Sequence, residues 1–267
     1  MKIQEYYLTE NEKPLDRIVS DGGFCGIFRK ICCIGDSLAS GEFETVDENG
    51  EKGYYDLYEY SWGQYLARMT GSKVYNFSRG GMTTREYMES FADANGFWSK
   101  DKAAQAYIVA LGVNDLMWCA QEIGTIKDID RNDWRMNKGT FAGWYGQILQ
   151  RIRDISPDSV LFLMTMPKET SDCQEWKERK AIHAELLWKM SELFRDTYVL
   201  DFYRYAPVYD QKFKENFYFN GHMNASGYLL TAKMTASYID WIIRGNPAKF
   251  AATGLIGTGI SPGVLIQ

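Results

Sequence analysis

The sequence predicts an α/β fold in which helices cover both faces of a parallel β-sheet, giving three layers. Short apolar runs with the length of buried strands alternate along the chain with segments of helical periodicity. The candidate functional residues follow these apolar runs or lie in loops toward the C-terminal end. Sites in open parallel sheets form at the carboxyl ends of strands, so the two observations support the same fold class.

Five strands and five helices are predicted from this alternation. The strands are expected at residues 31–34, 73–78, 106–112, 159–166 and 198–203. The helices are expected at residues 61–69, 83–91, 141–155, 173–194 and 225–243. Residues 42–59 are rich in Asp, Glu, Gly and Tyr and are expected to form a loop with a partial helix. Residues 116–138 are expected to form a long excursion at the edge of the sheet.

The length of 267 residues is enough to bury a sizeable core. Residues 1–29 show no clear period and are predicted to be an N-terminal extension packed on the domain. The domain itself is expected to span residues 30–244. The apolar, glycine-rich tail at 245–267 is expected to cover an apolar patch or to meet a partner subunit, which leaves a homo-oligomer open.

Composition argues against several classes of protein. The net charge is −5, and basic and acidic residues are interleaved, so nucleic acid is not an expected partner. No apolar run reaches the length of a membrane span, and no signal peptide is expected at the N-terminus. The five cysteines lack zinc-ligand spacing, so no metal is expected. Free thiols suit a cytoplasmic location.

A serine directly follows the first predicted strand, in the run Gly35-Asp36-Ser37-Leu38. A strand holds such a side chain rigidly, and the turn lifts its hydroxyl off the sheet edge. Ser37 is therefore a candidate nucleophile, although Asp-Ser after a strand is also an ordinary helix N-cap. A serine nucleophile needs a base, and only two histidines are present. His183 falls within a predicted helix and is interpreted as a helix-face residue, whereas His222 lies in a loop and is the candidate base.

Hydrolysis of an ester also needs hydrogen-bond donors for the oxyanion. The candidates are the backbone N–H groups of Ser37 and Gly81 and the side-chain amide of Asn114. An amide donates without a charge that would compete for the histidine proton. Gly81 lies in the turn after the second predicted strand and Asn114 follows the third, so all these donors are expected at the same edge of the sheet.

These motifs together resemble the SGNH (GDSL) hydrolase superfamily. The resemblance is carried by Gly35-Asp36-Ser37-Leu38, Asn76 with Gly81, Gly112-Val113-Asn114-Asp115, and His222 before Asn224 and Gly227-Tyr228. It implies a flavodoxin-like three-layer α/β/α sandwich with a five-stranded parallel sheet, and esterase, lipase or carbohydrate-deacetylase activity without a cofactor. It also implies Ser37 as nucleophile, Gly81 and Asn114 as oxyanion donors, and His222 as base.

One position departs from the family pattern. An aspartate usually stands three residues before the histidine, and here that position is Phe219. A backbone carbonyl could hold the imidazole, leaving a Ser–His dyad. Alternatively Asn220 could orient the ring, or a carboxylate could come from elsewhere; the carboxylates considered are Asp201, Asp210 and Glu215.

The function predicted from these residues is that of a serine esterase acting on a small-molecule ester. Small acyl groups are expected, among them acetyl groups on carbohydrate, released through an acyl-enzyme on Ser37. An acyltransferase using the same residues, or a catalytically silent binding module, are the alternatives. Trp118 and Trp134 of the 116–138 excursion are expected to form part of the substrate wall, because aromatic faces suit sugar rings and acyl chains.

Overall fold

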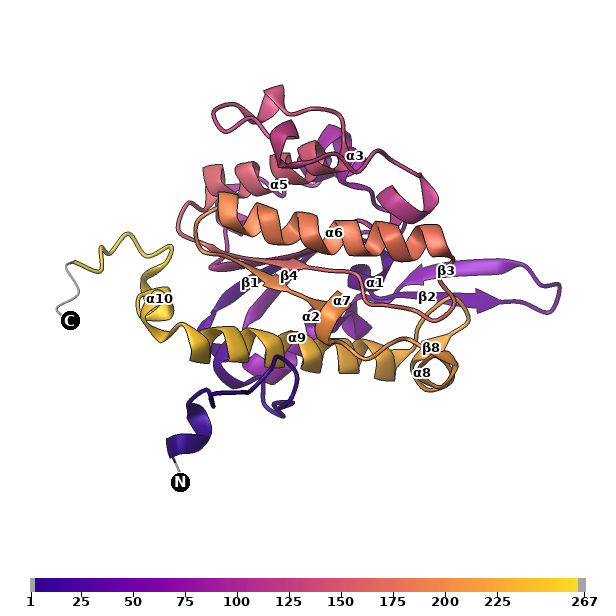
Figure 1. Ribbon diagram of the computed structural model, residues 1–267, viewed down its shortest axis with the longest axis horizontal. Coiled ribbons are helices and arrows are strands. Elements are labelled where there is room, and N and C mark those ends of the chain that lie inside the picture. Colours follow the sequence, from indigo (N-terminus) through magenta and orange to yellow (C-terminus); the bar gives the residue numbers. More distant parts are fainter. Residues whose placement is uncertain (1–2, 264–267) are drawn as a thin grey trace.

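A five-stranded parallel sheet lies at the centre of the computed structural model, which describes residues 3–263 (Figure 1). In chain order its strands are β1 (Lys30–Gly35), β4 (Lys73–Ser78), β5 (Ala106–Ala110), β6 (Val160–Met164) and β7 (Thr197–Leu200). Their order across the sheet is β4-β1-β5-β6-β7. After β1 the chain adds β4 on one side of it and then β5 on the other side. The strand order therefore reverses between β1 and β5, which is the switch point of the sheet.

Helices cover both faces of the sheet, which confirms the predicted three-layer α/β fold (Figure 1). On one face lie α2 (Trp62–Thr70) and α9 (Ala225–Gly245), and on the other lie α5 (Phe141–Ile155) and α6 (Gln174–Leu193). Side chains alternate between the two faces along each strand. Cys33 therefore packs with α2 and α9, whereas its neighbour Cys32 packs with the α5 side.

The remaining helical elements are short. The α-helices are α1 (Ser37–Ser40), α3 (Thr84–Glu86), α4 (Ala92–Ala94), α7 (Phe202–Tyr205), α8 (Gln211–Phe217) and α10 (Pro247–Phe250). Two π-helical turns span Tyr87–Phe91 and Asn114–Trp118. The 3-10 turns are Ile3–Tyr6, Gly23–Ile27, Tyr58–Tyr60, Lys100–Lys102, Ile126–Asp128, Trp134–Met136 and Thr253–Leu255.

Two small antiparallel hairpins form separate two-stranded sheets beside the parallel sheet. One pairs β8 (Tyr218–Phe219) with β9 (His222–Met223). The other pairs β2 (Glu42–Val46) with β3 (Lys52–Asp56) and projects from the body of the molecule (Figure 1). The expectation of a loop with a partial helix at 42–59 was therefore wrong, apart from the 3-10 turn. Asn49-Gly50 between two strand-forming runs is typical of a hairpin, and Gly50 adopts a left-handed φ of 82°.

Both terminal segments pack on the domain within the described residues. Toward the N-terminus, the Val19 N–H donates to Ser237 Oγ at 3.0 Å, and Trp241 Nε1 donates to the Glu12 carbonyl at 2.8 Å. In the tail, Phe250 is buried against aromatic rings of the core, among them Phe28. Residues 1–2 and 264–267 of the predicted extension and tail lie outside the described residues. No helix within residues 3–263 has the length and apolar character needed to cross a membrane.

A buried aspartate caps α1 where it leaves β1. Asp36 is 3% exposed, and its carboxylate accepts a hydrogen bond from the Leu38 N–H at 3.1 Å. Burial raises the pKa of Asp36 to about 7; the Leu38 hydrogen bond opposes this rise, and the charge of the buried Asp115 adds to it. The turn that presents Ser37 therefore holds an acid that favours its neutral form.

This burial predicts a pH-dependent stability. Between the ordinary pKa of aspartate near 4 and about 7, the folded protein binds this proton more than the unfolded chain does. Stability should therefore fall as the pH rises through that window. In an Asp36→Asn variant the amide oxygen still caps α1 without a charge. We expect this variant to exceed the wild type in free energy of unfolding by up to about 4 kcal/mol at pH 8, and by little at pH 4.

Urea unfolding of both proteins at pH 4, 6 and 8 measures this difference. A stability difference that is the same at all three pH values would show that Asp36 does not carry the pH dependence.

Candidate active site

The four predicted site residues line one cleft. Ser37, Gly81, Asn114 and His222 come from four separate segments, and they meet in a hollow of about 780 Å³ at the carboxyl edge of the sheet. Ser37 follows β1 and Asn114 follows β5, so the cleft opens at the switch point between these strands. Crevices at this place are where open α/β sheets bind their ligands.

The loops that carry Gly81 and Asn114 are fixed to each other. Gly81 has a left-handed φ of 71°, which favours glycine. Asn114 Nδ2 donates one hydrogen bond to the Met82 carbonyl at 3.0 Å, which leaves its second N–H for another acceptor. Asp115 Oδ1 accepts hydrogen bonds from both the N–H and the hydroxyl of Thr84, at 2.9 and 2.6 Å. The two candidate oxyanion donors thus belong to one braced unit.

Asn76, which belongs to the family resemblance, lies in β4. Its Nδ2 donates to the Ser40 carbonyl at 3.3 Å. This bond ties the edge strand of the sheet to the C-terminal end of α1, the helix that begins with Ser37.

Carboxylates contact both ring nitrogens of His222. Nδ1 lies 3.2 Å from Glu44 Oε2, and Nε2 lies 3.1 Å from Glu42 Oε1. Both glutamates belong to β2, where residues two apart point to the same side of the strand. The hairpin that the sequence interpretation missed therefore supplies two acidic groups to the candidate base.

Two glycines make room for these carboxylates. A Cβ built on Gly221 would overlap the carboxylate of Glu44, and one built on Gly80 would overlap that of Glu42. Glycine at both positions lets the turn before His222 and the turn after β4 approach the glutamates closely. Asn220 completes the hairpin turn with a left-handed φ of 56°.

The two glutamates differ in their charge environment. Burial acts to raise the pKa of Glu44, but the hydrogen bonds from Lys52 and His222 outweigh it, so the pKa is lowered. Lys52 Nζ lies 2.6 Å from Glu44 Oε1. Burial raises the pKa of Glu42, His222 opposes the rise, and Asp56 and Glu44 add to it. Within residues 3–263, no lysine or arginine forms an ion pair with Glu42. Glu44 therefore keeps its negative charge down to a lower pH than Glu42 does.

Neither Asp201 nor Asn220, the two residues predicted to orient His222, contacts its ring in a described hydrogen bond. Asp201 is fully buried, and its carboxylate accepts hydrogen bonds from Trp188 Nε1 at 2.8 Å and Thr165 Oγ1 at 3.2 Å. Its side chain also caps α7. Asn220 Nδ2 donates to the Glu44 carbonyl at 2.8 Å, so it holds the backbone of that glutamate and not the ring.

The other two acidic candidates also have different partners. Asp210 caps α8, and Glu215 accepts from Gln211. The alternative that a backbone carbonyl holds the imidazole is wrong as well, because His222 Nδ1 contacts the Glu44 carboxylate. Glu44 was missed because residues 42–59 were interpreted as a loop; the alternation of Glu42-Phe43-Glu44-Thr45-Val46 before Asn49-Gly50 is the signal that could have found it.

His183 is a core residue. It is fully buried against Phe141, and its Nε2 lies 3.3 Å from the Leu111 carbonyl. Burial lowers the pKa of His183 to about 4. No group of three or more His, Cys, Asp or Glu side chains in the described part of the chain could hold a metal ion.

Exposed aromatic rings stand at the rim of the cleft. Trp118 is 70% exposed, and its ring meets that of Trp176 edge-on at a centroid distance of 5.1 Å. Tyr54 of the β2–β3 hairpin is also exposed and lines the cleft. Trp134, the other expected wall residue, does not line this cleft; its ring is contacted by the guanidinium groups of Arg135 and Arg151.

The fold is similar to that of several solved structures. The chain is 16% identical to a family two carbohydrate esterase from Clostridium thermocellum, solved with cellohexaose, with a TM-score of 0.56 over 91% of this chain and 68% of that one. It is 15% identical to a carbohydrate esterase family 2 enzyme from Corynascus thermopiles (Myceliophthora fergusii), with a TM-score of 0.53 over 85% and 67% of the two chains. A carbohydrate acetylesterase from Sinorhizobium meliloti gives 12% identity and a TM-score of 0.53 over 80% and 99%.

A search of curated proteins found no significant relative. The sequence model of the GDSL-like Lipase/Acylhydrolase family, however, matches residues 33–230, which include every residue of the cleft motifs. That range covers most of the chain. The protein therefore belongs to the GDSL-like lipase/acylhydrolase family of the SGNH hydrolase superfamily, a family of carboxylic ester hydrolases.

Proposed function

We propose that this ester hydrolase works through an acyl-enzyme on Ser37, with His222 as general base and Glu44 as the carboxylate that orients His222. The observation that carries the proposal is the convergence of a serine, a histidine–carboxylate pair and two amide donors in one cleft. Each of these parts has a required role in acyl transfer from an ester.

The chemistry follows from the arrangement of these groups. Ser37 Oγ attacks the ester carbonyl while His222 Nε2 takes the hydroxyl proton. The contact between His222 Nδ1 and Glu44 fixes the tautomer and stabilises the imidazolium that forms. The oxyanion is bound by the N–H groups of Ser37 and Gly81 and by Asn114 Nδ2. His222 then protonates the leaving alcohol, and it later activates the water that releases the acid.

Glu42 has to move before the first step. Glu42, and not Ser37, lies within hydrogen-bond distance of Nε2. No hydrogen bond among residues 3–263 joins Ser37 to the ring. Catalytic hydrogen bonds are often made only in the substrate complex. Burial raises the pKa of Glu42 and so favours its neutral form, which lets this carboxyl keep the proton shared with Nε2 when it moves away and leaves Nε2 free to accept the serine proton.

The proposed substrates are esters of small acyl groups, such as acetyl, on a carbohydrate. The exposed rings of Trp118 and Tyr54 and the half-buried ring of Trp176 line the cleft and offer apolar faces to a sugar ring. A volume of about 780 Å³ suits a sugar ester of moderate size. The carbohydrate esterases among the structural neighbours lend this substrate class further support.

Replacing the nucleophile is the first test. We expect Ser37→Ala to reduce the hydrolysis of p-nitrophenyl acetate by about 10⁴-fold or more, because the acyl-enzyme cannot form. Circular dichroism and thermal unfolding of both proteins verify that the fold is retained. Wild-type turnover by the folded variant would refute the proposal, and a wild type that neither hydrolyses esters nor reacts with a fluorophosphonate would favour the binding module.

The orienting carboxylate has its own test. We expect Glu44→Gln to lower kcat by about 10²–10⁴-fold with little change in KM, because an amide cannot stabilise the imidazolium as a carboxylate does. Lys52→Met is the matched control: it removes the other partner of Glu44 and leaves the histidine contact in place, so kcat should fall less than about tenfold. If Asp201→Asn instead impaired kcat and Glu44→Gln did not, Glu44 would lose this role.

The aromatic rim is tested with two ester substrates. We expect Trp118→Ala to raise KM about 5–10-fold for an acetylated oligosaccharide, because a stacking partner is lost. Hydrolysis of p-nitrophenyl acetate, which has no sugar, should stay near the wild-type rate. Trp134→Ala, away from the cleft, should change neither. An equal effect of Trp118→Ala on both esters would argue against a sugar-binding rim.

A further inference from the structure

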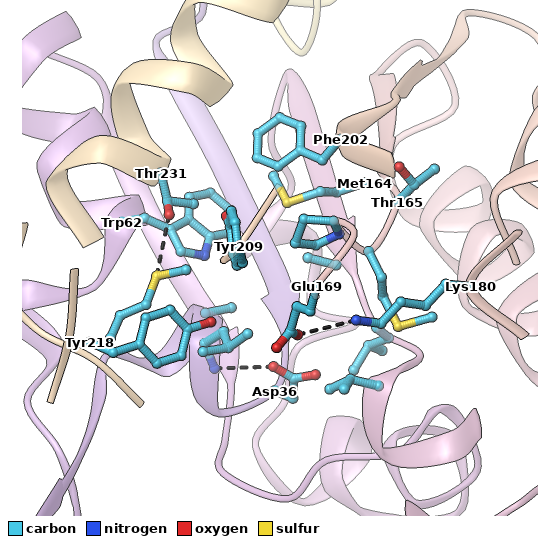
Figure 2. A pocket seen from close by; sticks show the side chains of 18 residues that line it. Asp36, Trp62, Met164, Thr165, Glu169, Lys180, Phe202, Tyr209, Tyr218 and Thr231 are labelled. Carbon is cyan, nitrogen blue, oxygen red and sulfur yellow. Dashed lines mark hydrogen bonds and ion pairs between the residues drawn. The ribbon is translucent and has the colours of Figure 1, made fainter. Parts of the chain in front are cut away.

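A second, smaller cavity lies beneath the cleft. It has a volume of about 90 Å³ and is bounded by α1, by the carboxyl ends of β5 and β6, and by the segment around α9. Trp62, Met164, Phe202 and Tyr209 surround its central space (Figure 2). We call this space, with Leu38 and Met223 in its wall, the inner cavity.

The inner cavity meets the cleft beside the proposed nucleophile. The same residues border both spaces: Leu38, Val113, Glu169, Lys180 and Tyr218. Leu38 directly follows Ser37, and Val113 directly precedes Asn114. A carbonyl bound between Ser37 and Asn114 therefore lies next to the neck of the cavity.

The wall of the inner cavity suits an aliphatic group. Apolar surface dominates it, and its two threonine hydroxyls already have partners within the protein. Thr231 Oγ1 donates to the Gly227 carbonyl at 3.0 Å, and Thr165 Oγ1 donates to Asp201 at 3.2 Å. A charged ligand would lose its hydration against this largely apolar wall, whereas a hydrocarbon chain would lose nothing.

The neck of the inner cavity is polar and held in place. Glu169 accepts from Lys180 at 3.1 Å and pairs with Lys214 at 2.8 Å, and Lys180 also pairs with Asp172 at 2.8 Å. Figure 2 shows the Glu169–Lys180 pair close to Asp36 at one end of the cavity. Lys180 is buried, so this network fixes the width of the entrance.

We propose that the inner cavity is the acyl-chain pocket of the enzyme and that it selects unbranched acyl groups of about four to five carbons. The inference rests on the proposed function and narrows its small acyl groups, of which acetyl is the shortest, to those that fill the cavity. A cavity of about 150 Å³ accommodates the six carbons of benzene, so about 90 Å³ has room for three to four carbons beyond the ester carbonyl. Each added methylene contributes about fourfold in kcat/KM until the cavity is full.

The experiment compares p-nitrophenyl acetate, butanoate and octanoate. For the wild type we expect kcat/KM to rise about 10–20-fold from acetate to butanoate and to fall again for octanoate. Met164→Phe narrows the cavity and should lower the butanoate-to-acetate ratio to near one. Met164→Ala widens it and should move the optimum to longer chains.

Met190→Ala is the matched control. Met190 is fully buried on the opposite face of the sheet, so this change removes the same side-chain atoms from the core without touching the inner cavity. It should leave the chain-length profile unaltered. If Met164→Phe does not fold, Met164→Ala still tests the pocket through its opposite shift.

The two proposals fail in different ways. Ser37-dependent hydrolysis of acetate, with a chain-length profile that neither Met164 variant changes, would overturn the pocket and leave the proposed function standing. A profile altered equally by Met190→Ala would also overturn the pocket. The absence of Ser37-dependent cleavage of all three esters would overturn the proposed function and the pocket with it.

Discussion

The site depends on the strand order, in which β4 and β5 are added on opposite sides of β1. Because β4 and β5 flank this strand, the loops that follow all three end at one place, and the gap between them is left open. The carboxyl end of β1 presents Ser37, while the loops after its neighbours carry Gly81 and Asn114. The bonds of Asp115 to Thr84 then brace the neighbouring loops across β1. The sheet order thus creates both the opening and the rigidity that preorganised hydrogen-bond donors need.

A histidine outside the sheet must be brought to this opening by other means. Here a two-strand hairpin, β2–β3, inserted directly after α1, supplies the carboxylate partner of His222. Burying a carboxylate is costly unless it is paired, and Glu44 is paired on both sides by Lys52 and His222. Gly80 and Gly221 permit the close approach. A carboxylate thus contacts the imidazole from a segment that precedes it in the chain, although Phe219 stands where the family pattern has an aspartate.

The strands and the long helices could be predicted from the sequence, because buried strands and amphipathic helices carry strong local periodicities. The predicted run at 73–78 coincides with β4, and the helix at 141–155 with α5. The partner of His222 could not be predicted with the same ease. Glu44 lies 178 positions away from the histidine, and no local pattern records a contact that only the tertiary fold creates. The β2–β3 hairpin did leave a signal, but the density of acidic and aromatic residues around its Asn-Gly turn resembles an irregular loop.

The alcohol part and the acyl part of an ester substrate need different kinds of space in the site. The alcohol part has to be exchanged with water, so it needs an open space, and the cleft with its exposed Trp118 provides one. In the proposed mechanism the acyl part stays attached to Ser37 between the two half-reactions, so it can lie in a narrower space, and core residues line the inner cavity beside Leu38. Because Trp62 and Phe202 belong to the apolar core under α9, the cavity cannot widen without a loss of packing. Selection of the acyl group would therefore be tied to the stability of the fold, while selection of the alcohol depends on rings at the surface that are free to vary.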